Sequence, residues 1–212
     1  MDSIIENKIH TVIFDLDGTL SDSAILTMAA FERVAPKANL PVPGIEAVRS
    51  ATGNPNPQFY YILFPELDRE MVFNMGQMVE AVELDVLPSV KDRLLFPGCR
   101  ELLIQLKKKG ISLCIASTGD REHVYSILRE TGIQELFDVV SCGQPDKIEM
   151  LRTLTAKGDK RGYLMVGDMK KDSEGARANG ILSVGVCYGY CRRELAEFDM
   201  YIDAPFDLLG LL

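Results

Sequence analysis

Two carboxylates separated by one residue are the first feature of this sequence that could perform chemistry. Residues 15–19 read Asp-Leu-Asp-Gly-Thr and directly follow an apolar run at residues 12–14. In an extended chain Asp15 and Asp17 would point the same way, and two charges about 4 Å apart repel by about 4 kcal/mol at an effective dielectric constant of about 20. A plain turn after a strand is the alternative, but the repulsion favours a site in which a partner neutralises both acids.

Three further groups of polar residues follow other apolar runs. They are Ser117 and Thr118 after residues 112–116, Lys147 just inside a helix after residues 138–141, and Asp168 and Asp172 after residues 163–166. Taken singly, each has an ordinary explanation, since a lone lysine is usually solvated and an aspartate suits the start of a helix. Their common position after apolar runs is what makes them informative together.

The apolar runs look like strands buried on both faces of a sheet. Five strands are expected, at residues 11–14, 112–116, 138–141, 163–166 and 183–186. From the second onward they alternate with helical segments, which is typical of an α/β fold with a Rossmann-like, doubly wound parallel sheet. Ligands of such sheets bind beyond the carboxyl ends of the strands. The four polar groups should therefore converge on one crevice.

A cluster of carboxylates with little nitrogen or sulfur nearby selects Mg²⁺. A bound cation would also let an acid-lined pocket accept a phosphate dianion. The chain has two histidines, and neither follows a strand directly: His10 precedes the first expected strand and His123 lies on a helix. We expect both histidines to be structural.

The stretch between the first two strands is too long for a simple crossover, which needs only about a dozen residues. It has no convincing strand and several helical stretches, such as residues 24–34 and 69–84, with a turn-rich loop at residues 52–57. We therefore expect two domains: a core at residues 1–21 and 96–212, and an inserted α-helical cap at residues 22–95.

Composition limits the classes of partner. The 212-residue chain is 47% hydrophobic and 25% charged with a net charge of −8, which disfavours nucleic acid and anionic lipid as partners. No apolar stretch approaches the roughly 20 residues that span a bilayer. Residues 1–8 lack the basic start and apolar run of a signal peptide. We expect a cytoplasmic protein that is a monomer or a weak dimer.

The cysteines agree with a reducing compartment, because none belongs to a Cys-x-x-Cys pair. The five are Cys99, Cys114, Cys142, Cys187 and Cys191. Cys187 and Cys191 form the one close pair, and the sequence assigns no role to them.

In order and spacing, the four polar groups and the helical insertion resemble the haloacid dehalogenase (HAD) superfamily, in its phosphoglycolate phosphatase-like group, over essentially the whole chain. The resemblance implies that Asp15 attacks phosphorus to give an aspartyl-phosphate, a covalent intermediate of a familiar type. It implies that Asp17 protonates the leaving group and then activates water.

The resemblance also implies the binding residues. Phosphate would be held by Gly18, Ser117, Thr118 and Lys147, and Mg²⁺ by Asp15, the backbone carbonyl of Asp17, Asp168 and Asp172. In the cap, Gly53 and Asn54 resemble a loop that faces the active site in this family, and Arg49 before it is a candidate clamp for a substrate carboxylate or phosphate.

Other branches of the superfamily fit less well. Dehalogenases lack the acid found here as Asp17, and sugar phosphomutases commonly carry Val at the position of Thr19 and a histidine in the first cap helix, which residues 21–36 lack. Phosphonate-cleaving enzymes need an imine-forming cap lysine, and Lys37 and Lys91 lack the apolar burial that lowers a lysine pKa. We expect a phosphatase acting on a small phosphorylated metabolite.

Alternatives remain. Within the superfamily they are a sugar phosphomutase of the β-phosphoglucomutase type, an inorganic pyrophosphatase and a nucleotidase. From other classes they are a receiver-type signalling module, whose phosphoacceptor lies on a later strand and which needs no cap, and a non-catalytic binding protein of the HAD fold. Such binding proteins usually lose one of the acids, and this chain retains all of them.

Overall fold

The structure of the protein is a computed structural model that describes residues 9–54, 56–190 and 197–212. The N-terminal segment that we compared with a signal peptide, residues 1–8, and Cys191 lie outside the described residues. The chain divides into two compact units, Met1–Ser21 with Leu95–Leu212, and Asp22–Leu94.

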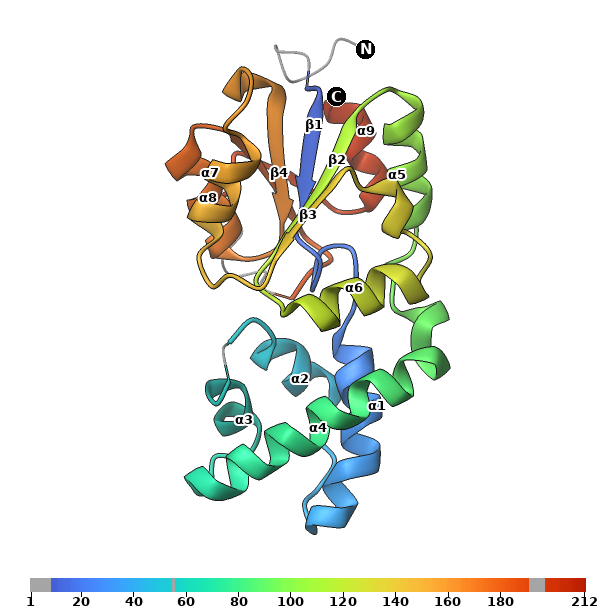
Figure 1. Ribbon diagram of the computed structural model, residues 1–212, viewed down its shortest axis with the longest axis vertical. Coiled ribbons are helices and arrows are strands. Elements are labelled where there is room, and N and C mark those ends of the chain that lie inside the picture. The colour runs from blue at the N-terminus through green and yellow to red at the C-terminus, as the bar shows by residue number, and fades with distance from the viewer. Residues whose placement is uncertain (1–8, 55, 191–196) are drawn as a thin grey trace. The chain divides into compact units, whose positions relative to one another are not determined.

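The first unit is built on a six-stranded parallel sheet with the strand order β3-β2-β1-β4-β5-β6 (Figure 1). The strands are β1 (Thr11–Phe14), β2 (Ser112–Ser117), β3 (Val139–Cys142), β4 (Tyr163–Gly167), β5 (Leu182–Val186) and β6 (Met200–Ile202). The doubly wound parallel sheet expected from the sequence is confirmed. The five expected strands differ from the observed ones only at their ends, and β6 is additional.

The helices of this unit cover both faces of the sheet, with α7 and α8 on one face and α5 and α9 on the other (Figure 1). They are α5 (Cys99–Lys108), α6 (Arg121–Glu130), α7 (Lys147–Leu154), α8 (Lys170–Asn179) and α9 (Leu208–Leu211). Short 3₁₀ turns occur in this unit at Gln134–Leu136, Lys160–Gly162 and Pro205–Asp207, and in the second unit at Ala35–Ala38 and Lys91–Arg93. Because helices cover both faces, the central strands carry almost only buried apolar residues.

The point where the chain reverses its direction of travel across the sheet lies between β1 and β4. From β1 the chain continues on one side through β2 and β3, and it returns to β4 on the other side. Phe14 of β1 pairs with both Ile115 of β2 and Val166 of β4. This register brings the residues that follow the three strands to the same edge, where the two sets of crossovers leave a crevice.

The second unit is entirely helical within its described residues. Its helices are α1 (Ala24–Val34), α2 (Ile45–Ala51), α3 (Gln58–Leu63) and α4 (Arg69–Val90). Phe31 of α1 packs against the rings of Phe59, Tyr60 and Phe64. The helix expected at residues 69–84 continues to residue 90 through Pro88. A proline removes one helical hydrogen bond, and the burial of Val86, Leu87 and Val90 near this helix end offsets that loss.

The chain passes between the two units along adjacent segments, residues 20–22 and 94–96, which we call the paired crossing. Ser21 and Leu95 form an antiparallel bridge, and Phe96 N–H donates to the carbonyl of Leu20 at 3.0 Å. Asp22 N–H donates to the carbonyl of Leu94 at 2.7 Å. The chain therefore leaves the first unit at residue 22 and returns to it after residue 94, and the two connecting segments are hydrogen-bonded to each other.

Among the described residues, no helix combines the length and the apolar character that crossing a membrane requires. Two of the five cysteines, Cys99 and Cys114, are buried, and burial raises the pKa of the Cys114 thiol to about 11. Neither thiol has the lowered pKa of a reactive cysteine.

Candidate active site

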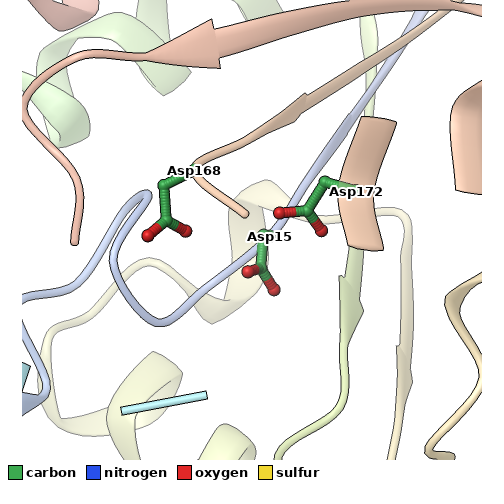
Figure 2. A group of neighbouring side chains, drawn as sticks. All are labelled: Asp15, Asp168 and Asp172. Carbon is green, nitrogen blue, oxygen red and sulfur yellow. The ribbon is translucent and has the colours of Figure 1, made fainter. Parts of the chain in front are cut away.

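Three buried aspartates gather at the carboxyl edge of the sheet. Carboxylate oxygens of Asp15, Asp168 and Asp172 all lie within 4.8 Å of one another. The residues are 3%, 0% and 0% exposed, respectively. Figure 2 shows the three carboxyl groups directed toward a common region from three separate segments of the chain. Such a group of buried acids is costly unless positive charge neutralises it.

The sheet places these acids. Asp15 directly follows β1, and its backbone N–H donates to the carbonyl of Val166 at 2.9 Å, so it continues the pairing with β4. Asp168 directly follows β4. Asp172 lies in the first turn of α8, where its Oδ2 accepts the Met169 N–H at 3.0 Å. The two strands that flank the reversal point therefore supply two acids, and the helix after β4 supplies the third.

Glycines make the close approach of these segments possible. A Cβ at Gly167 would lie 2.3 Å from Asp172 Oδ2, and a Cβ at Gly18 would lie 2.4 Å from Asp168 Oδ2. Gly18 also has φ +85°, a left-handed conformation that glycine adopts readily. Its N–H donates to the Ser21 carbonyl at 2.8 Å. Gly18 thus lets the loop pass beside Asp168, and its contact with a phosphate remains a prediction.

Lys147, the first residue of α7, brings a buried positive charge to the cluster and is 3% exposed. Its Nζ donates to Asp15 Oδ1 at 2.7 Å and lies 2.8 Å from Asp172 Oδ1. It also donates to the carbonyl of Ala116, at the end of β2. One ammonium group therefore joins three segments of the site and fixes one oxygen of Asp15.

The ionisation of the cluster reflects burial and crowding. Burial, with the charge of Asp172, raises the pKa of Asp15 to about 6, although Lys147 opposes the shift. Burial and then the charges of Asp15 and Asp172 raise the pKa of Asp168 well above its usual value. Burial alone would lower the pKa of Lys147, but Asp15 and Asp172 hold it above its ordinary value. The lysine is thus cationic, and positive charge near the cluster would favour the ionised forms of Asp15 and Asp168.

The cluster fits a divalent cation. Asp172 Oδ1 is completely buried, and Lys147 Nζ lies 2.8 Å from it. Asp168 Oδ1 accepts from the Thr19 hydroxyl at 3.2 Å and Oδ2 from the Tyr190 N–H at 3.0 Å, so its orientation is fixed. When all three acids are ionised, one lysine leaves an excess of two negative charges, which a dication bound by oxygen ligands would neutralise.

Hydroxyl groups and a second lysine lie at the end of β2. Ser117 is 1% exposed, and its Oγ accepts the Gly119 N–H at 3.0 Å. Because Oγ already accepts there, the hydroxyl hydrogen remains available to a phosphoryl oxygen. Thr118 Oγ1 accepts from Lys171 Nζ at 2.8 Å, and the charge of Lys171 lowers the pKa of Asp15.

Asp17 lies apart from the acidic cluster. Its Oδ1 is 3.1 Å from Nε2 of His123, in the first turn of α6. We expected His123 to be structural, and the fold places its ring beside a candidate catalytic acid. The Nδ1 atom of His10 lies 2.8 Å from Thr11 Oγ1, and its ring packs edge-on against Tyr163, so its structural role remains a prediction.

The candidate specificity residues lie in the helical unit. Arg49, in α2, donates from Nε to Asp22 Oδ1 at 3.3 Å, from Nη2 to Asp22 Oδ2, and from Nη1 to Glu46 Oε1 at 2.6 Å. Its guanidinium is therefore held by two carboxylates of its own unit. Gly53 has φ +90°, and the Asn54 side chain donates to the Ala51 carbonyl at 2.8 Å. A contact of these residues with substrate remains a prediction.

Two residues of the site, Lys171 and His123, were not among the predicted ones. Lys171 has the sequence signal of a surface charge, since it lies in the first turn of a helix beside Lys170. Its position three residues after Asp168 was the one available hint. His123 is 106 residues from Asp17, and no local pattern joins residues so far apart.

Comparisons with known proteins agree with this geometry. The haloacid dehalogenase-like hydrolase family matches residues 12–186. A phosphoglycolate phosphatase from Synechococcus elongatus is 30% identical, over 94% of this chain and 95% of that protein. The tyrosine-protein kinase PtkA of Mycobacterium tuberculosis is also 30% identical, over 88% of this chain but 65% of that protein.

Solved structures give the same fold. A haloacid dehalogenase-like family hydrolase from Streptococcus pneumoniae superimposes with a TM-score of 0.81 at 24% identity, covering 95% of this chain and 97% of that one. The family match includes most of β1, the helical insertion and all three aspartates of the cluster. The chain is therefore an enzyme of the haloacid dehalogenase-like hydrolase family.

Proposed function

We propose that this enzyme is a Mg²⁺-dependent phosphatase that hydrolyses a small phosphate monoester through an aspartyl-phosphate at Asp15. The observation that carries the proposal is the setting of Asp15, buried among Asp168, Asp172 and Lys147 with one carboxylate oxygen held by the lysine at 2.7 Å. A carboxylate fixed in this way, beside positive charge, suits in-line attack on a phosphoryl group.

In the first step an oxygen of Asp15 attacks phosphorus, the bond from phosphorus to the ester oxygen breaks, and Asp17 gives its proton to the departing oxygen. In the second step Asp17 takes a proton from a water molecule that attacks phosphorus, and the acyl phosphate bond to Asp15 breaks. Asp17 suits this double role because its carboxyl group is partly exposed and lies outside the buried cluster.

The transferring phosphoryl group needs donors and positive charge. Ser117 offers its hydroxyl hydrogen, and Lys147 offers the ammonium group that already bonds to Asp15. Lys171, which donates to Thr118, adds a second cation on the side of β2. These groups neutralise the phosphoryl oxygens, which is the principal requirement of phosphoryl transfer.

Asp15, Asp168 and Asp172 would hold the Mg²⁺, and the metal would supply positive charge that stabilises the phosphoryl oxygens. Without that charge, a buried group of three acids and one lysine would repel an anionic substrate. The proposal that the Asp17 carbonyl is a further ligand is supported by the family resemblance alone.

The substrate is proposed to be a small soluble phosphate ester in the cytoplasm, and phosphoglycolate is the first ester to test because a relative of similar length bears that name. Arg49, held in place by Asp22 and Glu46, is the proposed contact for a carboxylate of the substrate. Such a contact would require the guanidinium to exchange at least one of its present partners.

The test measures release of inorganic phosphate from a panel that includes phosphoglycolate and nitrophenyl phosphate, with Mg²⁺ or with a chelator. The wild-type protein should turn over at least one ester with Mg²⁺ and none with the chelator. Asp15→Asn should lower kcat at least about 1,000-fold, because it removes the nucleophile and keeps the shape.

The matched control is Asp92→Asn, the same chemical change at an exposed position of the helical unit, which should leave kcat unchanged. Full activity of Asp15→Asn, or equal activity with the chelator and with Mg²⁺, would contradict the proposal.

A further inference from the structure

His123 contacts the candidate acid–base residue from a part of the chain that the proposed mechanism does not use. Its Nε2 lies 3.1 Å from Asp17 Oδ1, and the two side chains are 19% and 20% exposed. The pair is thus shielded from bulk water on most sides but open enough to meet a substrate. A hydrogen bond in such a place constrains a side chain more than one at the surface does.

The histidine is fixed by the helix that carries it. Asp120 caps α6 and accepts the His123 backbone N–H at 3.0 Å. The next residue, Val124, is completely buried, as are Ile127 and Leu128 one turn later. A side chain held by a capped and anchored helix is positioned more accurately than one on a loop.

The other oxygen of Asp17 faces the loop that follows β2. A Cβ at Gly119 would lie 3.4 Å from Asp17 Oδ2 and 3.2 Å from Ser117 Oγ. Oδ1 therefore faces the imidazole, and Oδ2 faces the backbone beside Ser117, the proposed phosphate ligand. The carboxyl group of Asp17 therefore lies between His123 and the backbone of Gly119, both of which belong to the segment from β2 to α6.

We propose that His123 is a positioning residue for Asp17, an inference that rests on the proposed phosphatase function. A neutral imidazole with its hydrogen on Nε2 donates to Oδ1. Oδ1 can accept this bond when Asp17 is ionised, and it can still accept when Asp17 carries its proton on Oδ2. The bond therefore survives both proton transfers and presents Oδ2 to the leaving oxygen and then to water.

The test compares two esters with different needs for an acid. A nitrophenyl group leaves without protonation, whereas an alkyl alkoxide needs a proton as it departs. We expect His123→Ala to lower kcat/KM by about tenfold or more for an alkyl phosphate and by less than about threefold for nitrophenyl phosphate. The ratio kcat/KM is chosen because it reports the steps up to formation of the aspartyl-phosphate.

Two variants separate positioning from folding. His123→Gln can place a donor nitrogen near the position of Nε2 and should recover most of the lost activity on the alkyl ester. Glu122→Ala, at the exposed neighbouring position of α6, should match the wild type on both esters. Equal losses on both esters in His123→Ala, or no recovery in His123→Gln, would overturn the positioning role.

A spectroscopic measurement tests the contact without turnover. The chain has two histidines, so ¹⁵N signals of the rings are readily separated. The His123 signals should show the Nε2–H tautomer and shift in Asp17→Ala, while those of His10 should not move. If the wild type hydrolyses no ester, the phosphatase proposal fails and this one fails with it; an active wild type with unshifted His123 signals overturns this one alone.

Discussion

Asp15 has to be ionised to attack phosphorus, yet its surroundings favour its protonated form. Burial raises its pKa to about 6, and Lys147 only partly opposes that shift. A raised pKa means that the folded state binds the proton more tightly than the unfolded state does. The contribution of Asp15 to the free energy of unfolding is therefore fully present below the ordinary pKa near 3.8. It is lost as the pH rises through about 6.

The metal-free protein should accordingly lose stability between about pH 4 and pH 6. A shift of about two pKa units at one buried carboxyl corresponds to at most about 3 kcal/mol of unfolding free energy. Urea unfolding at a series of pH values, in a chelator, measures this loss. Added Mg²⁺ should restore stability at neutral pH, because it binds the ionised cluster.

The variant Asp15→Asn isolates the contribution of Asp15, because the amide cannot ionise. The free energy of unfolding of this variant should depend less steeply on pH than that of the wild type. Asp168, whose pKa is also raised, should keep part of the dependence. An unchanged slope in Asp15→Asn would show that the stability change has another source.

At the scale of elements, the junction between β4 and α8 is a tightly packed part of the site. Gly167 ends β4, and a Cβ there would lie 2.3 Å from Asp172 Oδ2 and 2.5 Å from Asp172 Cβ. The first turn of α8 therefore packs directly on the end of the strand. This contact lets Asp168 and Asp172 belong to one cluster.

Gly167→Ala should separate the strand from the helix. We expect the free energy of unfolding to fall by about 1–3 kcal/mol, the usual cost of overpacking. Because Asp172 is displaced, the variant should also need a higher Mg²⁺ concentration for full activity. Urea unfolding and activity against Mg²⁺ concentration measure the two effects. Gly210→Ala, where a Cβ meets nothing within 4 Å, is the matched control, and equal behaviour of the two variants would contradict the packing argument.

The strands that precede Asp15 and Asp168 were predictable because each is short, apolar and followed by a polar group. Strand β6 was not, because it has three residues, of which Tyr201 is 43% exposed, so it lacks the run of buried residues that marks the central strands. The contact of His123 with Asp17 depends on how α6 follows β2, which periodicity does not reveal. Likewise, the contact of Arg49 with Asp22 joins residues 27 positions apart, whereas its contact with Glu46 is an ordinary pair three residues apart within α2.

At the scale of the whole molecule, the paired crossing makes the two units separable. Ser21 and Leu95 already form an antiparallel bridge, so a two-residue Asn-Gly turn could join them as in a hairpin. Replacing residues 22–94 with this turn should leave a cooperatively folding sheet, with a denaturant m-value smaller by about a third because less surface is exposed on unfolding.

Circular dichroism and urea unfolding test this prediction. If the helical unit selects the substrate, the shortened chain should hydrolyse nitrophenyl phosphate but no longer distinguish it from other esters. A shortened chain that fails to fold would show that the sheet depends on the insertion, and one that keeps its preferences would place selectivity in the first unit.

The paired crossing also bears on how such a molecule can change over generations. A segment that departs and returns at one place can be lengthened, replaced or lost through a single insertion or deletion, and the strand register beneath it stays the same. Asp15, Asp168 and Asp172 are all fixed by elements outside that segment. The catalytic residues can therefore be inherited unchanged while the substrate specificity changes. Relatives that share one reaction can then act on different metabolites.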